Sequence, residues 1–183
     1  MNLPNLITLG RLLSVPVVVW LILGDQYLWA FWVFVAAGIS DAADGFIAKH
    51  FNAETELGQF LDPIADKALL VSVYLALGHA GQLATWLVIL VVFRDCLIVV
   101  GAVLFQTLIR HLTVQPLLVS KLNTTAQIVL AAAVLGVLGF QLNAFCVMVV
   151  DILAYIVAAT TLLSGGAYVV KWSRLAAALE EGD

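Results

Sequence analysis

Six apolar stretches of about 20 residues each, separated by short polar breaks, constrain this chain more than any other feature. A helix of about 20 apolar residues spans the hydrocarbon core of a bilayer, so each stretch is predicted to be a transmembrane helix. Hydrophobic residues make up 63% of the 183 residues and charged residues only 11%, which argues against a water-soluble domain. We therefore expect an all-α integral membrane protein that forms one domain over residues 1–183. The predicted helices cover approximately residues 6–24, 27–48, 58–78, 83–108, 117–139 and 144–170.

The basic residues predict how the six helices are oriented. The breaks near residues 25, 80 and 141 contain no Lys or Arg, whereas the opposite helix ends hold seven of the eight basic residues. Positive charge near short loops marks the cytoplasmic side, and an even number of spans places both termini there. The residues from 173 to 183 would form a short amphipathic or frayed cytoplasmic tail. The seven basic residues are Arg11, Lys49, Lys67, Arg110, Lys121, Lys171 and Arg174.

Net charge and cysteine content argue against two other classes of protein. The net charge is −4 and there is no basic stripe, so no nucleic-acid partner is expected. Cys96 and Cys146 lie singly within apolar runs, which predicts neither a disulfide framework nor a thiolate metal site.

Six of the twelve acidic residues lie between positions 41 and 66. Asp41 and Asp44 are three residues apart at the cytoplasmic end of the second stretch, and Asp62 and Asp66 are four apart at the start of the third. These spacings put each pair on one helix face. Because a short loop joins the two stretches, we expect them to be antiparallel neighbours whose four carboxylates converge.

Converging carboxylates at a membrane require compensating charge. An Asp near the bilayer centre costs roughly 2.5–3.5 kcal/mol, and less near the interface. Lys49 and Lys67 could neutralise two of the aspartates, and divalent cations would neutralise more. Oxygen ligands without nearby His or Cys suit Mg²⁺ or Mn²⁺, and two such ions form a clamp for displacement at phosphorus. The sequence therefore predicts a metal site at the cytoplasmic ends of the second and third helices.

Two glycines and a proline accompany the aspartates. Gly45 follows Asp44 and Gly58 precedes Asp62 by four residues, and a missing side chain lets a ligand or a backbone approach closely. Pro63 either opens the third helix directly after Asp62 or kinks a helix that begins near Thr55.

The run Asp41-x2-Asp44-Gly45-x2-Ala48-Lys49-x8-Gly58-x3-Asp62-x3-Asp66 resembles the signature of the CDP-alcohol phosphatidyltransferases. The family usually has Arg where this chain has Lys49, which keeps the charge but loses the bidentate fork. The resemblance covers the whole chain, and residues 2–11 resemble the N-terminal segment of bacterial members.

This resemblance implies a site, cofactors and partners. It implies a homodimer among membrane lipids, in a bacterial inner membrane, with the active site facing the cytoplasm. It also implies two divalent cations, Mg²⁺ or Mn²⁺, bound by the four aspartates, with Asp66 as the general base. The residues implied around the CDP-lipid head group are Asn5, Thr8, Asp41, Gly45, Lys49, Thr55 and Gly58.

The donor implied by the resemblance is CDP-diacylglycerol, and the second half of the chain bears on the acceptor. Three features of this half resemble cardiolipin synthases: Asn123, the pair Arg94-Asp95 and the uncharged segment 101–105. In those enzymes phosphatidylglycerol is the acceptor and CMP is released. Glycerol 3-phosphate is the alternative acceptor, in a phosphatidylglycerophosphate synthase. The residues expected to bind the acceptor are Lys121, Arg110 and Arg94.

Charged residues deep in the apolar stretches leave other interpretations open. Adjacent helix positions point about 100° apart, so Arg94 and Asp95 are not expected to pair with each other. A structural bridge from Arg94 to Asp151 is an alternative to a role at the acceptor. Clustered carboxylates also suit a cation transporter or proton relay, but that class predicts polar residues across the membrane. Here they stop at the cytoplasmic half, apart from Arg94, Asp95 and Asp151.

Overall fold

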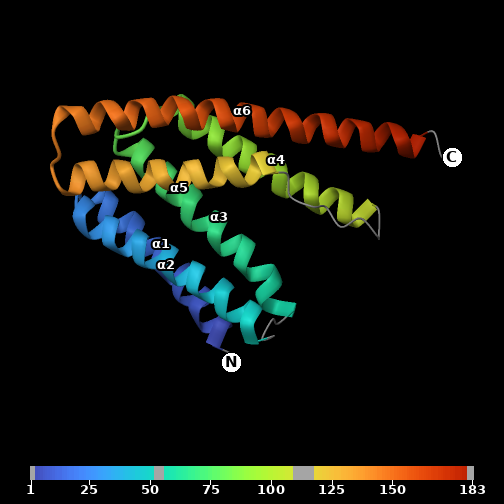
Figure 1. Ribbon diagram of the computed structural model, residues 1–183, viewed down its shortest axis with the longest axis horizontal. Coiled ribbons are helices and arrows are strands. Elements are labelled where there is room, and N and C mark those ends of the chain that lie inside the picture. The colour runs from blue at the N-terminus through green and yellow to red at the C-terminus, as the bar shows by residue number, and fades with distance from the viewer. Residues whose placement is uncertain (1–2, 52–55, 109–117, 181–183) are drawn as a thin grey trace.

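The structure of the chain is a computed structural model. It describes the backbone of residues 3–51, 56–108 and 118–180, and within these ranges the side chains of residues 8–40, 65, 67–101 and 118–173. The regular elements in this part of the chain are all α-helices (Figure 1). In chain order they are α1 (Leu3–Leu23), α2 (Tyr27–Phe51), α3 (Glu56–His79), α4 (Thr85–Leu108), α5 (Leu118–Gly139) and α6 (Ala144–Glu180).

The six helices confirm the six predicted helical stretches, with differences at their ends. Helix α2 continues through Lys49 to Phe51, so the polar break before α3 is shorter than predicted. Helix α3 begins at Glu56, so Pro63 lies within it and does not open it. Helix α6 continues to Glu180, so most of the predicted tail is helical.

Short turns reverse the chain between three pairs of helices. Asp25 follows α1 with φ of 56°, Gly81 follows α3 with φ of 72°, and Gln141 follows α5 with φ of 51°. A left-handed residue just after a helix is a common way of ending it. These turns lie in the breaks that the sequence predicted near residues 25, 80 and 141.

The helices pack into one bundle in which α3 and α5 hold central places. Helix α1 packs against α2 and α3, α5 packs against α2, α3 and α6, and α4 packs against α3 and α6. Figure 1 shows α5 and α6 running alongside each other, with α1 and α2 below them. The sequence predicted α2 and α3 to be neighbours; in the described part of the chain, α1 contacts both and links them.

The buried core draws apolar side chains from all six helices. Close approach of the backbones also matters, because packing holds helices together in a bilayer, where lipid is as apolar as Leu. At the end of α5, a Cβ added to Gly139 would lie 2.7 Å from the Cα of Leu28 at the start of α2. The core includes Ile22, Phe34, Val73, Leu77, Leu87, Leu130, Leu135 and Val157.

The outer surface of the bundle is strongly apolar. Large hydrophobic side chains that are at least half exposed occur on every helix, which fits positions that face lipid. Examples, in order from α1 to α6, are Leu13, Ile39, Leu75, Ile89, Leu122 and Leu163.

Two helical segments in the described residues are long and apolar enough to cross a bilayer. They are Leu118–Gly139 in α5 and Ala144–Ser173 in α6. Shorter apolar segments occur in three further helices: Thr8–Leu23, Tyr27–Ser40 and Lys67–His79. The helical fold and its apolar surface fit a membrane protein, and the six-span count and the cytoplasmic termini stay predictions.

Candidate active site

The four aspartates predicted to bind metal lie on two helix ends. Asp41 and Asp44 are in the last three turns of α2, and Asp62 and Asp66 are in the first three turns of α3. The backbone is helical at all four positions, so the spacings of three and four put each pair on one helix face. The two helices are joined through residues 52–55, so the helix ends are at most roughly 18 Å apart.

The side chains of these aspartates lie outside the described residues, so their convergence on metal stays a prediction. Among the side chains that the structure describes, no group of three or more His, Cys, Asp or Glu could hold a metal ion. Thr8, Arg94 and Lys121 are predicted site residues with described side chains. The predicted site residues outside the described residues or side chains are Asn5, Gly45, Lys49, Thr55, Gly58 and Arg110.

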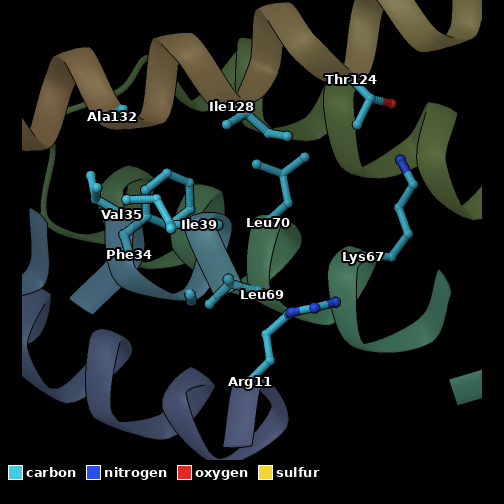
Figure 2. Close-up of a pocket in the computed structure, with 12 residues that line it drawn as sticks. Arg11, Phe34, Val35, Ile39, Lys67, Leu69, Leu70, Thr124, Ile128 and Ala132 are labelled. Carbon is cyan, nitrogen blue, oxygen red and sulfur yellow. The ribbon is translucent and has the colours of Figure 1, made fainter. Parts of the chain in front are cut away.

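A pocket of about 390 Å³ lies between α1, α2, α3 and α5. Figure 2 shows Arg11, Lys67 and Thr124 together on one side of this pocket, while apolar side chains line the rest. Its volume lies within the range of about 300–1,000 Å³ that is usual for small-molecule sites. The apolar lining consists of Phe34, Val35, Ala37, Ile39, Leu69, Leu70, Ile128 and Ala132, together with Gly38.

The polar side of the pocket adjoins the aspartate motif. Lys67 directly follows Asp66 on α3, and Arg11 lies one helical turn after Thr8 on α1. Arg11 and Thr8 are each only 3% exposed. Two cations beside an apolar cavity match a ligand that has a negatively charged phosphate and a hydrocarbon chain.

Lys67 is held by an acidic residue from the neighbouring helix. Its Nζ donates a hydrogen bond to Asp95 Oδ2 across 2.7 Å, and Asp95 is only 2% exposed. The sequence suggested that Lys67 would neutralise one of the motif aspartates. In the structure Lys67 pairs with Asp95 on α4, and whether it also neutralises a motif aspartate stays a prediction, because those side chains lie outside the described residues.

Arg94 forms the other half of this buried network. Its Nη1 donates to Asp95 Oδ1 at 2.7 Å and its Nη2 to Ser120 Oγ of α5 at 2.6 Å. Its Nε donates to Ser164 Oγ of α6 at 3.2 Å, and its Nη2 contacts the same hydroxyl. Arg94 therefore ties α4 to α5 and α6. Contact between Arg94 and an acceptor stays a prediction.

Two expectations about Arg94 are wrong. Arg94 does pair with Asp95, because its long side chain spans the angle between adjacent positions and a buried cation requires a charged partner. The α6 partner of Arg94 is Ser164, not Asp151. Asp151 is exposed and lies thirteen residues earlier on α6, roughly 20 Å along the helix axis.

Lys121 and Asn123, which bear on the acceptor, face different surroundings on α5. Lys121 is exposed, whereas Asn123 is fully buried. Asn123 Oδ1 accepts hydrogen bonds from Thr160 Oγ1 at 2.8 Å and Thr161 Oγ1 at 3.0 Å, both on α6. Asn123 therefore joins α5 to α6 in the bundle interior.

Sequence reasoning missed the roles of Arg11, Ser120 and Ser164. Arg11 served only to orient the first helix, although a cation inside an apolar helix is by itself an indication of a functional site. Ser120 and Ser164 carry no such signal, because serine is common at helix contacts in membranes for packing reasons alone.

Comparison with known proteins identifies the family. The family model for CDP-alcohol phosphatidyltransferases matches residues 1–172. With the aspartate motif on two adjoining helix ends, this match shows that the chain belongs to the CDP-alcohol phosphatidyltransferase family.

The chain is similar to relatives with two different names. It is 36% identical to CDP-diacylglycerol–glycerol-3-phosphate 3-phosphatidyltransferase 1, chloroplastic, of Oryza sativa subsp. japonica, over 96% of this chain and 58% of the relative. It is 33% identical to cardiolipin synthase (CMP-forming) of Rattus norvegicus, over 74% of this chain and 50% of the relative. The chain thus spans about half the length of each of these relatives.

Proposed function

We propose that this protein transfers a phosphatidyl group from CDP-diacylglycerol to phosphatidylglycerol, forming cardiolipin and releasing CMP. The observation that carries this proposal is the pocket whose cationic side adjoins the aspartate motif, with Lys67 next to Asp66. A phosphate-bearing lipid fits such a pocket, and family membership favours a transferase over a cation transporter.

The donor set of the motif suits two divalent cations. Its four carboxylates supply oxygen ligands alone, and the helical backbone presents them as two pairs on two adjoining helix ends. Asp41, Asp44, Asp62 and Asp66 would hold Mg²⁺ or Mn²⁺. When bound, these ions neutralise the pyrophosphate of the donor and favour departure of CMP.

The residues of the chain would carry out the remaining chemistry. Asp66 accepts the proton of the acceptor hydroxyl, and the hydroxyl oxygen attacks the β-phosphorus of CDP-diacylglycerol. The new phosphorus–oxygen bond forms as the bond to the bridging pyrophosphate oxygen breaks, and that oxygen leaves with CMP. Asn5, Thr8, Gly45, Lys49, Thr55 and Gly58 would surround the donor head group, while Arg11 and Lys67 meet lipid phosphate.

The choice of phosphatidylglycerol rests on the limited positive charge near the site. A phosphomonoester carries close to two negative charges and requires a dense cationic pocket, whereas phosphatidylglycerol carries one. Arg94 is surrounded by Asp95, Ser120 and Ser164, which leaves Lys121 and Arg110 as the cations proposed for the acceptor.

Phosphatidylglycerophosphate synthesis is the second candidate function, with glycerol 3-phosphate as the acceptor. The similarity to the Oryza sativa protein, over nearly the whole of this chain, favours it. For either reaction we propose a homodimer in a membrane, with the active site facing the cytoplasm of a bacterial cell.

The experiment that tests the proposal separates the two acceptors. The purified full chain is given labelled CDP-diacylglycerol with Mg²⁺ or Mn²⁺, and either phosphatidylglycerol or glycerol 3-phosphate. We expect labelled cardiolipin and CMP with phosphatidylglycerol. Product formed with glycerol 3-phosphate alone would replace the first function with the second, and no product with either would refute both.

A further inference from the structure

The ion pair between Lys67 and Asp95 is not used by the chemistry proposed above. We propose that Asp95 is a positioning residue, which holds the Lys67 ammonium at the polar side of the pocket so that it binds the phosphate of an anionic lipid. The inference rests on the proposed function for the identity of the reaction, but the binding itself can be measured without turnover.

Both oxygens of Asp95 are engaged by cations. Oδ2 accepts from Lys67 Nζ and Oδ1 accepts from Arg94 Nη1, each across 2.7 Å. Arg94 is anchored in turn to hydroxyls on two other helices, Ser120 on α5 and Ser164 on α6. Asp95 therefore cannot follow a movement of Lys67 without disturbing the packing of α4, and its position fixes that of the ammonium.

The charges of this cluster leave an excess on the pocket side. Two cations share one carboxylate, so the cluster of Lys67, Arg94 and Asp95 carries a net charge of +1. Arg94 and Asp95 have side chains only 3% and 2% exposed, whereas the Lys67 side chain is 27% exposed and lines the pocket. Among the side chains that the structure describes, an incoming anion can reach the excess charge of this cluster only at Lys67.

The remaining lining of the pocket specifies the kind of anion. Arg11 supplies a second cation on the same side, and the apolar wall built by Phe34, Leu70 and Ile128 accepts a hydrocarbon chain (Figure 2). A ligand that satisfies both sides carries a phosphate and an acyl chain. A free Lys side chain is flexible and loses rotamer freedom when it is ordered. Asp95 restricts this freedom before the lipid binds, which preserves affinity.

A purely structural role for the Lys67–Asp95 pair makes a different prediction. In that case the pair only ties α3 to α4, and removing either charge lowers stability without changing the affinity of the folded protein for anionic lipid. The positioning role predicts a loss of affinity that depends on the charge of the lipid.

The test measures lipid binding to the full chain in a neutral detergent. The probes are dioctanoyl phosphatidylglycerol, which is anionic, and dioctanoyl phosphatidylcholine, which is zwitterionic. We expect Lys67→Met to weaken phosphatidylglycerol binding about tenfold, the effect of losing one charged hydrogen bond, with phosphatidylcholine unchanged. Lys67→Arg keeps the charge and should restore most of the affinity. Thr125→Ala, at an exposed position of α5 that does not line the pocket, is the matched control.

Asp95→Asn tests the positioning step itself. We expect it to weaken phosphatidylglycerol binding severalfold, and to add nothing further in the Lys67→Met background, because Asp95 acts through Lys67. If Asp95→Asn does not fold, Asp95→Glu takes its place: the longer side chain displaces the ammonium, and affinity for phosphatidylglycerol should again fall.

Three results would overturn the inference. They are unchanged phosphatidylglycerol affinity in Lys67→Met, equal losses for both lipids, or full additivity of the substitutions at 67 and 95. Measuring transfer on the same wild-type samples separates the two proposals. Charge-dependent binding without transfer would refute the proposed function alone, whereas transfer with binding that does not depend on Lys67 would refute this inference alone.

Discussion

Lys67 Nζ lies 2.7 Å from Asp95 Oδ2, although the two residues are 28 positions apart in the chain. This ion pair joins α3, which carries two of the motif aspartates, to α4. Lys67 is the residue after Asp66, and Asp95 is buried beside Arg94. The end of α3 nearest the predicted metal site is therefore connected, through Asp95 and Arg94, to α5 and α6.

Replacing either aspartate on α3 should stop the reaction. Asp62→Asn and Asp66→Asn keep the side-chain size but remove a predicted metal ligand. Asp66→Asn also removes the predicted general base, and general base catalysis typically raises a rate by about 10²–10⁴-fold. We expect the rate of CMP release to fall by about 100-fold or more, while the protein still inserts into membranes. Glu56→Gln, in the first turn of α3, is the control and should retain activity. Turnover near the wild-type level in Asp66→Asn would refute its assignment as base.

Asn123 should contribute to stability through α6. Asn123→Ala removes the acceptor that Thr160 and Thr161 share; Thr160 can still donate to the Val157 carbonyl, but the buried Thr161 hydroxyl loses its Asn123 acceptor, and an unpaired buried polar group costs about 1–3 kcal/mol. We expect a lower thermal unfolding midpoint in detergent. Thr125→Ala, an exposed residue of the same helix, is the comparison and should change little. Equal midpoints for the two variants would contradict the helix-joining role of Asn123.

Gly139 should not tolerate a side chain. A Cβ at this position would lie 2.7 Å from the Cα and 2.8 Å from the backbone nitrogen of Leu28, and a backbone cannot rotate away as a side chain can. Gly139→Ala should destabilise the protein by about 1–3 kcal/mol, the usual effect of overpacking. Gly166→Ala on α6 meets no atom within 4 Å and should be neutral or slightly stabilising. Unfolding of both variants in parallel checks the difference, and a Gly139→Ala protein as stable as wild type would show that α2 and α5 can separate there.

Lys121 should affect the acceptor rather than the donor. Its side chain is exposed on α5, where it can meet a phosphate without breaking a buried contact. Lys121→Met should raise KM for phosphatidylglycerol about tenfold, as loss of one charge-assisted hydrogen bond predicts, with KM for CDP-diacylglycerol unchanged. Lys121→Arg retains the charge and should stay close to wild type. A change in the donor KM alone would place Lys121 elsewhere in the reaction.

The number and positions of the helices could be predicted because apolar stretches of spanning length leave the backbone few alternatives in a bilayer. Helix ends were less predictable. Residues 49–51 and 173–180 are polar enough to suggest loops, yet the structure continues α2 to Phe51 and α6 to Glu180. Helical hydrogen bonds continue past the apolar stretch where no Gly or Pro interrupts them.

The partners of buried charges could not be predicted from spacing. The sequence shows that Arg94 and Asp95 lie inside an apolar helix, and helix geometry gives the directions of their Cβ atoms. It does not give the reach of the Arg side chain or the proximity of Ser164, which lies 70 residues away in the chain. Those contacts depend on how α4 crosses α6, and no local pattern encodes that crossing. The motif aspartates are a different case, because their spacing on two helices joined by a short segment already limits where they can lie.

The central claim is that Asp41, Asp44, Asp62 and Asp66 hold the divalent cations needed for phosphatidyl transfer. The measurement that tests it most directly is CMP release from CDP-diacylglycerol by the full chain in vesicles containing phosphatidylglycerol, first with EDTA and then with Mg²⁺ or Mn²⁺ restored. We predict that release stops with EDTA and returns when either metal is added in excess. Release that continues undiminished in EDTA would contradict the claim.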